Sequence, residues 1–170
     1  MARPSRALHQ SSATNGRRKL ALVASKGSLD MAYPPLILAN AARMSGIDVE
    51  MFFTFWGLDI ITKKKMNKLN VATVGNPNMH PWFGIPTLLG ALPGMSAAAS
   101  WMMRGEIKKL GFPRVPEFIQ LVIDAGANVY GCKMSMDMMK LTEDDLVEGA
   151  TVLGAMEFMD LTDGAQIVFV

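Results

Sequence analysis

Cys132 is the only cysteine in this chain, and it lies where a strand-like run gives way to a helix-like run. Residues 127–130 are typical of a strand, and the methionine-rich residues after Cys132 are typical of a helix. Backbone N–H groups at the start of a helix, together with the adjacent Lys133, favour the thiolate over the thiol. This position predicts a nucleophilic cysteine with a lowered pKa; the alternative is a buried structural thiol, a common role for free cysteine.

Three further residues are candidates for binding or chemistry around Cys132. Met134 belongs to a cluster of methionines that predicts flexible core filling, a soft lining for sulfur species, or a copper(I) site formed with the thiolate. His80 is either a base for Cys132 or an ordinary loop histidine. Lys26 follows the first predicted strand and is either an anion ligand or an exposed turn residue.

Composition excludes several classes of function. One cysteine rules out an intrachain disulfide and any CxxC motif, which favours a reducing compartment such as the cytoplasm. The two histidines, His9 and His80, are too few for a multi-histidine metal site. No Walker A sequence and no complete GxGxxG motif occurs, so a nucleotide-binding or flavin-binding module is the weaker alternative. We therefore expect neither a metal nor a cofactor.

The basic charge of the chain belongs to its N-terminal tail. Residues 1–18 contain four arginines and no acid, which leaves 13 basic against 15 acidic residues in the remainder. We therefore expect no nucleic-acid-binding face. The tail is rich in Ser and Arg and lacks an apolar stretch, so it is predicted to be disordered, with the folded domain at 19–170.

The order of apolar runs predicts an α/β domain. Half of the residues are hydrophobic, enough for a substantial core. Strands are predicted at residues 19–24, 48–55, 69–74, 127–130 and 166–170, and helices at 29–45, 57–65, 95–110, 116–126, after Cys132, from 142, and at 149–160. Mostly apolar strands alternating with helices favour a parallel sheet covered on both faces.

Ligands of such sheets bind beyond the carboxyl ends of the strands, where separate loops converge. That edge is expected to collect the residues following each predicted strand: Ser25, Lys26 and Gly27; Thr54 and Trp56; residues 76–80; and Cys132 with Lys133.

Residues 69–103 contain no Asp, Glu, Lys or Arg. The part from 84 to 103 is long enough to span a bilayer, but Pro86, Pro93 and three glycines disfavour a transmembrane helix. A buried helix or an oligomer contact at 95–110 is favoured, and membrane contact stays open.

Four segments carry a resemblance to a known family. Residues 24–35 (ASKGSLDMAYPP), 52–58 (FFTFWGL), 92–95 (LPGM) and 131–139 (GCKMSMDMM) are similar to the DsrE/DsrF/DrsH-like superfamily over residues 19–170. The cysteine run is the most specific of these. The resemblance implies a flavodoxin-like fold and a homo-oligomer, either trimer, tetramer or hexamer.

The same resemblance implies a function. Cys132 would carry sulfane sulfur as a persulfide and pass it to a TusA-like carrier, a rhodanese or a heterodisulfide-reductase-like complex in cytoplasmic sulfur trafficking or oxidation. Some relatives have a second cysteine, which this chain lacks, so a resolving intramolecular disulfide is impossible. The alternative is a non-catalytic oligomeric subunit that docks onto a membrane or redox complex through residues 69–103.

Overall fold

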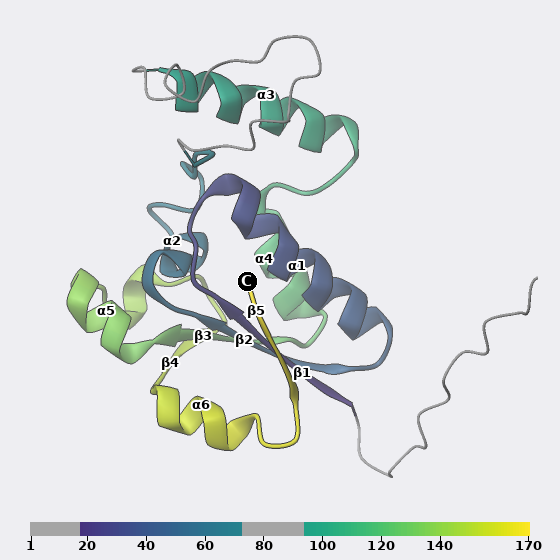
Figure 1. The fold of residues 1–170 in the computed structure, drawn as a ribbon, viewed down its shortest axis with the longest axis vertical. Helices are drawn as coiled ribbons and strands as arrows, with labels where there is room; N and C mark the ends of the chain where they lie inside the picture. The colour runs from purple at the N-terminus through teal and green to yellow at the C-terminus, as the bar shows by residue number, and fades with distance from the viewer. Residues whose placement is uncertain (1–17, 73–93) are drawn as a thin grey trace, which may run out of the picture.

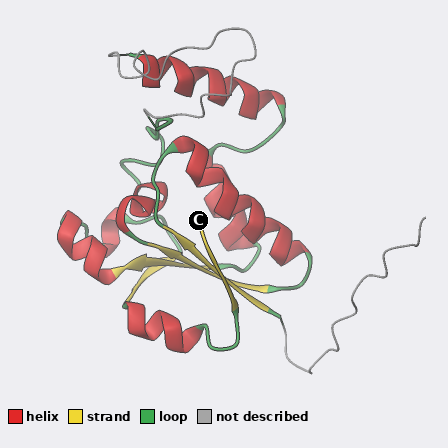
Figure 2. Cartoon of the chain, viewed as in Figure 1, coloured by secondary structure: helices red, strands yellow, loops and turns green. Residues whose placement is uncertain are grey.

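A five-stranded parallel sheet forms the centre of the molecule (Figures 1 and 2). The computed structural model describes residues 18–72 and 94–170. The strands lie in the order β4-β3-β2-β1-β5. Their bounds are Lys19–Ala24 (β1), Asp48–Phe53 (β2), Asn128–Cys132 (β3), Ala150–Leu153 (β4) and Gln166–Phe169 (β5). The predicted flavodoxin-like α/β class is confirmed.

Helices cover both faces of the sheet (Figure 1). The helices are α1 (Leu29–Met44), α2 (Leu58–Ile61), α3 (Met95–Lys109), α4 (Val115–Asp124), α5 (Lys133–Met139) and α6 (Ala155–Leu161), with 3₁₀ turns at Phe55–Gly57 and Glu143–Asp145. Because β5 pairs with β1 rather than with β4, the chain crosses the sheet once more after β4. Helix α6 makes that crossing on the face opposite to α1 and α4.

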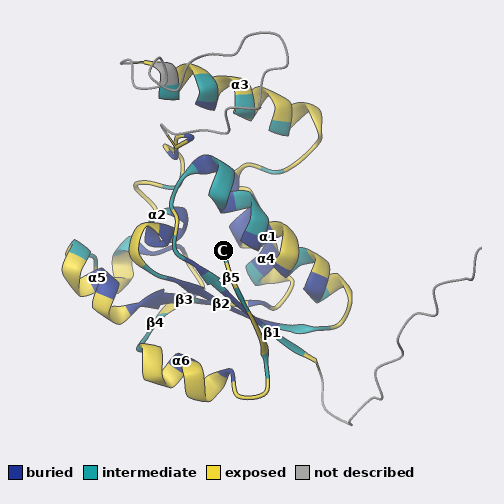
Figure 3. Ribbon diagram, viewed as in Figure 1, coloured by how far each residue is buried: buried dark blue, intermediate teal, exposed yellow. Residues whose placement is uncertain are grey.

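The hydrophobic core lies mainly between the sheet and the α1/α4 layer. Leu22, Met51 and Phe53 of the strands and Ile119 and Val122 of α4 are at most 1% exposed. The opposite face has a smaller cluster of Ala21, Phe52, Cys132 and Phe158, the last from α6. Alternate residues of β2 therefore enter different clusters, as expected for a strand buried on both sides (Figure 3).

Two predicted elements are wrong. The helix at 149–160 is instead β4 followed by α6, because the run Ala150–Leu153 pairs with β3 from Val129↔Ala150 to Cys132↔Leu153. The strand at 69–74 is not formed over residues 69–72, and its last two residues lie outside the described ranges. There, α3 takes the place of a neighbouring strand: Val71 N donates to Ser100 Oγ at 2.8 Å, and Ser96 Oγ donates to Val71 O at 2.9 Å.

Smaller differences concern the ends of elements. The second strand stops at Phe53, because residues 55–57 form a 3₁₀ turn, and the helix predicted at 57–65 extends only over Leu58–Ile61. Helix α1 begins at Leu29, as predicted, and contains Pro34 and Pro35. Residues 1–17 of the predicted tail, His80 and the first half of the segment 84–103 lie outside the described residues. Within the described ranges, no helix is both long and apolar enough to cross a membrane.

Candidate functional site

Cys132 is the last residue of β3 and immediately precedes α5. Its side chain is nearly covered, with 3% of the residue exposed. Phe53 of β2 lies opposite Gly131 of β3, so the next residues along each strand, Thr54 and Cys132, lie side by side at the carboxyl edge. The sheet therefore places the thiol where ligands of parallel α/β sheets are bound.

Two hydroxyl groups accompany the thiol. Thr54 Oγ1 and Ser135 Oγ lie 3.0 Å apart and share a hydrogen bond, which joins the end of β2 to the first turn of α5. Ser135 is 1% exposed. A buried hydroxyl keeps its orientation because few partners are available to it, so this pair forms a fixed polar wall beside the sulfur.

The surroundings of Cys132 favour its thiolate. Burial raises the pKa of Cys132, but hydrogen bonding from the Ser135 hydroxyl and amide, from the Thr54 hydroxyl and from the Met134 amide lowers it further than burial raises it. The net pKa lies below the ordinary value for cysteine. The thiolate is the attacking form of cysteine, so the site is arranged for a nucleophile.

The sheet face that carries Cys132 is aromatic and contains a buried acid. Phe52 stacks on Phe158 of α6 with ring centroids 4.5 Å apart. On the same face Tyr130 donates its hydroxyl hydrogen to Glu50 Oε2 at 3.0 Å. Burial, with this hydrogen bond and the charge of Glu50, raises the pKa of Tyr130 to about 12. Tyr130 is therefore a neutral hydrogen-bond donor in the physiological pH range.

A backbone clamp fixes the loop after β2. A Cβ on Gly57 would lie 2.1 Å from the Ala24 carbonyl oxygen, and one on Gly27 would lie 2.1 Å from the Trp56 carbonyl oxygen. The loops that follow β1 and β2 therefore approach each other so closely that only glycine fits at positions 27 and 57. Phe55, between these contacts, has φ 47°, a strained value for a bulky side chain.

The clamped loop presents aromatic side chains to solvent. Phe55 is 45% exposed and Trp56 is 65% exposed, although both follow a fully buried strand. On α5, Met134 and Met138 are also exposed, at 69% and 59%. These four residues, called here the apolar rim, lie on the segments that follow β2 and β3 at the edge of the sheet that carries the thiol.

The predicted binding residues have different places at this edge. Met134 lies on the apolar rim and contributes its amide to the thiolate. Lys133 is exposed and its ammonium donates to Asp137 Oδ2 at 3.4 Å, along the outside of α5. Lys26 is exposed and follows β1. Because β2 lies between β1 and β3, the ends of β1 and β3 are about 10 Å apart, two steps between neighbouring strands. His80 lies outside the described residues.

Sequence reasoning did not single out Ser135. The sequence does contain one indication of its role. Ser135 comes three residues after Cys132 in the first turn of a helix, and side chains on a helix are tilted toward its N-terminus, here toward Cys132. The pairing of Ser135 with Thr54 depends on β2 lying next to β3, which no local pattern specifies.

The described part of the site supports nucleophilic chemistry at sulfur without a dedicated base. Serine and threonine hydroxyls donate to a thiolate but do not remove the proton of a thiol at neutral pH. No group of three or more His, Cys, Asp and Glu able to hold a metal ion occurs within residues 18–72 and 94–170.

Comparison with known proteins agrees with this architecture. The model of the DsrE/DsrF/DrsH-like family matches residues 16–170. The chain belongs to this family. It is 38% identical over 157 residues to the sulfur carrier protein DsrE2 of Allochromatium vinosum, a match that covers 89% of this chain and 96% of that one. It is 25% identical over 164 residues to YrkE of Bacillus subtilis, covering 92% and 99% of the two chains.

Solved structures share the fold of this family member. The ychN protein of E. coli superposes with a TM-score of 0.53 at 15% identity, covering 90% of this chain and 99% of that one. MTH1491 of Methanobacterium thermoautotrophicum gives a TM-score of 0.51 at 10% identity, with the same coverage. At these identities the likeness concerns the fold alone.

Proposed function

We propose that this protein is a cytoplasmic sulfur carrier or sulfurtransferase that holds sulfane sulfur as a persulfide on Cys132 and passes it to a partner protein. The observation that carries the proposal is a single covered thiol whose pKa is lowered by fixed donors. It occurs in a chain 38% identical to a protein named a sulfur carrier.

Loading needs no cofactor. The Cys132 thiolate attacks the outer sulfur of thiosulfate; a new S–S bond forms, the S–S bond of thiosulfate breaks, and sulfite leaves with the bonding electron pair. Unloading is an exchange of the same kind in which Cys132 is the leaving group. An acceptor thiolate attacks the outer sulfur of the persulfide, and the Cys132 thiolate is released. Neither step needs an external oxidant or reductant.

The apolar rim supports transfer between proteins. Exposed aromatic and methionine side chains are enriched where one protein docks on another, and tryptophan contributes disproportionately to such contacts. Because only 3% of Cys132 is exposed, exchange with thiosulfate or with thiols in solution should be slow, whereas the thiol of a docked acceptor is held beside the persulfide. A TusA-like carrier, a rhodanese or a heterodisulfide-reductase-like complex would meet this requirement.

Intact mass measurement tests loading. After incubation with thiosulfate or polysulfide and desalting, the wild type should gain the mass of one sulfur atom, and reduction should remove it. Cys132→Ser should gain nothing. A wild-type protein that shows no gain, or a Cys132→Ser variant that shows the same gain, would refute the proposal.

A matched pair of tryptophan variants tests transfer separately. Trp56→Ala should load normally but transfer sulfur to a TusA-like acceptor about tenfold more slowly, since it removes an exposed anchor beside the thiol. Trp101→Ala removes a 78% exposed tryptophan from α3 and should leave both steps unchanged. Equal behaviour of the two variants would argue against docking at the apolar rim.

A homo-oligomer is the second part of the proposal, and the surface of α6 and β5 favours it. Met156 and Met159 of α6 are 82% and 56% exposed, and Ile167 and Phe169 of the edge strand β5 are 46% and 70% exposed (Figure 3). A second copy of the chain would cover this surface. Light scattering should give a multiple of the chain mass that Phe169→Glu reduces; a monomeric wild type would refute self-association.

The non-catalytic alternative makes an opposite prediction. If the protein only docks onto a membrane or redox complex, Cys132→Ser should complement a deletion strain, and charged substitutions within residues 84–103 should not. Loss of complementation by Cys132→Ser excludes this alternative.

A further inference from the structure

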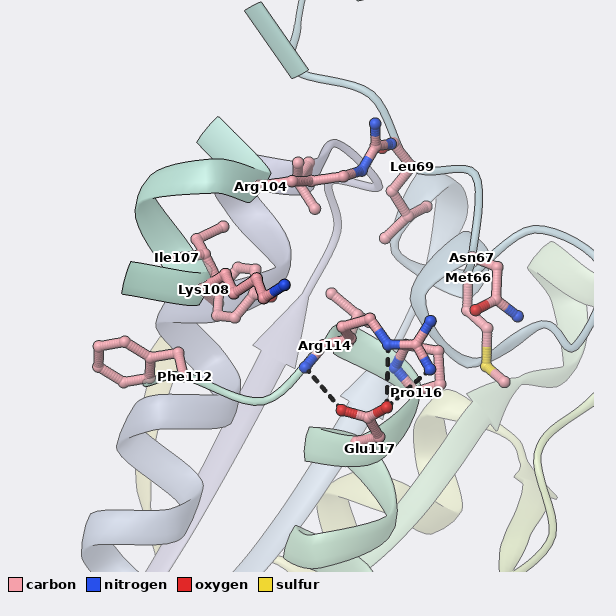
Figure 4. Close-up of a pocket in the computed structure, with 13 residues that line it drawn as sticks. Met66, Asn67, Leu69, Arg104, Ile107, Lys108, Phe112, Arg114, Pro116 and Glu117 are labelled. Atoms are coloured by element: carbon pink, nitrogen blue, oxygen red, sulfur yellow. Dashed lines mark hydrogen bonds and ion pairs between the residues drawn. The ribbon is translucent and has the colours of Figure 1, made fainter. Parts of the chain in front are cut away.

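A cavity of ≈ 550 Å³ lies away from Cys132, between α3 and the N-terminal ends of α1 and α4 (Figure 4). Leu29 begins α1, Val115 begins α4, and Leu69 and Ile107 come from the segment before residue 73 and from α3. Thr54, Cys132 and Ser135 do not line it. Its volume is within the usual range for small-molecule sites.

The wall of the cavity carries excess positive charge. Arg104, Lys108 and Arg114 line it together with a single acid, Glu117. Arg114 Nη2 pairs with Glu117 Oε1 at 2.7 Å. Arg104 Nη2 donates instead to the carbonyl oxygen of Leu69 at 2.6 Å. Among the described residues, neither Arg104 nor Lys108 pairs with a carboxylate.

Arg104 and Lys108 bring their positive charges to the same side of the cavity. Arg104 and Lys108 are four residues apart on α3, so their side chains extend from the same face of the helix. The N-terminal end of α4 faces the same space, and its dipole adds to the positive potential. An anionic group in the cavity would therefore be attracted from two elements.

Apart from Asn67, the rest of the wall is apolar and aromatic. Leu69 and Val115 are 5% and 3% exposed, and Phe112 packs edge-on against Tyr33 with ring centroids 6.5 Å apart. The hydroxyl of Tyr33 already donates to Pro113 O at 3.0 Å, so the phenol adds surface rather than a free donor. Such a wall accommodates an apolar body but does not specify further polar groups.

We propose that this cavity binds a small amphipathic anion: an organic carboxylate, sulfonate or phosphate ester whose charged head lies toward Arg104 and Lys108 and whose apolar body contacts Ile107 and Phe112. This binding is independent of the sulfur chemistry at Cys132. It would give the protein a second small-molecule site, formed largely by α3.

Displacement of a fluorescent probe tests the proposal. The probe is 1-anilinonaphthalene-8-sulfonate, itself an amphipathic anion. It should bind the full-length protein saturably and be displaced by decanoate and by decyl phosphate. Decanol, which has the same tail without charge, and inorganic phosphate, which has the charge without a tail, should displace it only weakly. Added salt should weaken decanoate binding.

Adjacent lysines provide matched variants. Lys108→Glu should weaken decanoate binding about tenfold or more, because it replaces an attraction by a repulsion. Lys109→Glu changes charge by the same amount, but Lys109 does not line the cavity and pairs with Glu106, so binding should be unchanged. Ile107→Trp should abolish binding by filling the space, without any change of charge. Cys132→Ser should bind as the wild type does.

Several results would overturn the proposal. Equal displacement by decanoate and decanol would remove the role of the cations, and equal loss in Lys108→Glu and Lys109→Glu would place the anion elsewhere. Binding of the protein to phosphatidylglycerol vesicles without displacement of the probe by decanoate would instead assign the surface to membrane contact.

Discussion

Removing the Ser135 hydroxyl should suppress the reactivity of Cys132 at neutral pH. Ser135 is 1% exposed, and its hydroxyl and amide are the first two of the hydrogen-bonding groups that lower the pKa of Cys132. Ser135→Ala removes the hydroxyl and keeps the amide, so the pKa of the thiol should rise toward that of an ordinary cysteine. The side chain of alanine fits the space left by serine, so the fold should be preserved.

The size of the effect follows from the charge of the acceptor. A hydrogen bond to a charged group contributes about 1.5–3 kcal/mol, and about 1.4 kcal/mol corresponds to a factor of ten in an equilibrium. Below the pKa, the thiolate population of Ser135→Ala should therefore fall about ten- to a hundredfold. Thr54→Val should act in the same direction. Because Thr54 and Ser135 also bond each other at 3.0 Å, the double variant should lose less than the sum of the two.

Alkylation by iodoacetamide as a function of pH measures this directly. The midpoint of the rate profile should move to higher pH in Ser135→Ala, while the plateau at high pH stays equal or rises slightly, because thiolates of higher pKa are intrinsically stronger nucleophiles. Ser45→Ala, which removes a hydroxyl bonded to Ala41 O at the end of α1, is the control and should leave the profile unchanged. An unchanged midpoint would refute the role of Ser135, and a lower plateau alone would show that it governs access instead.

Three further predictions concern stability. Gly57→Ala should lower the free energy of unfolding by about 3 kcal/mol, because its Cβ would lie 2.1 Å from Ala24 O. The Cβ of Gly105→Ala in α3 meets no other atom, so this variant should raise the free energy of unfolding by up to about 1 kcal/mol. Urea unfolding compares the two variants. Leu22→Ala, at a residue 0% exposed, should cost about 2–5 kcal/mol in the same assay. The pKa of Tyr130 is raised to about 12, so its contribution to stability is fully present below pH 10 and is lost as pH rises through 12. Tyr130→Phe should remove this loss, and absorbance titration should show an ionisation near pH 12 in the wild type only, beside that of Tyr33, whose pKa burial also raises.

The strands of the central sheet could be predicted because their own residues carry the signal. The runs at β1 and β2 are short and mostly apolar, and a strand buried on both faces has that composition. The run Ala150–Leu153 has the same property in only four residues, and it was included in a longer helix-like stretch. Its identity as a strand is settled by pairing with β3, an interaction with residues about twenty positions away.

The strand predicted at residues 69–74 is wrong over residues 69–72 for a different reason. Leu69 and Val71 are buried and strand-like in composition, but their backbone groups bond to α3, which supplies Ser96 and Ser100. Burial and backbone hydrogen bonding were both satisfied without a sheet. A local pattern measures only the first of these requirements, so it could not distinguish the two outcomes.

The candidate site divides in a similar way. The position of Cys132 at a strand-to-helix junction follows from the residues on either side of it, so the sequence was sufficient to place the thiol. The hydroxyl of Thr54 reaches it only because β2 is the neighbour of β3 and Phe53 lies opposite Gly131. The amides at the start of α5 are predicted by the strand-to-helix junction, but the order and register of strands depend on the whole sheet, so the Thr54 hydroxyl could be named as a partner only from the structure.

A lone thiol places a particular demand on its surroundings. Without a second cysteine, a persulfide on Cys132 can be released only by a nucleophile from outside the chain, so selectivity depends on which nucleophiles reach it. The covering of Cys132 limits small thiols, and the exposed Phe55 and Trp56 offer a larger partner a place to bind. Phe55 and Trp56 belong to the loop that Gly57 holds against the end of β1, in which Phe55 keeps a strained φ of 47°. The backbone strain therefore lies in the loop that exposes Phe55 and Trp56. A substitution that loosens the contact of Gly57 with β1 should impair the choice of partner before it impairs the reactivity of the thiol.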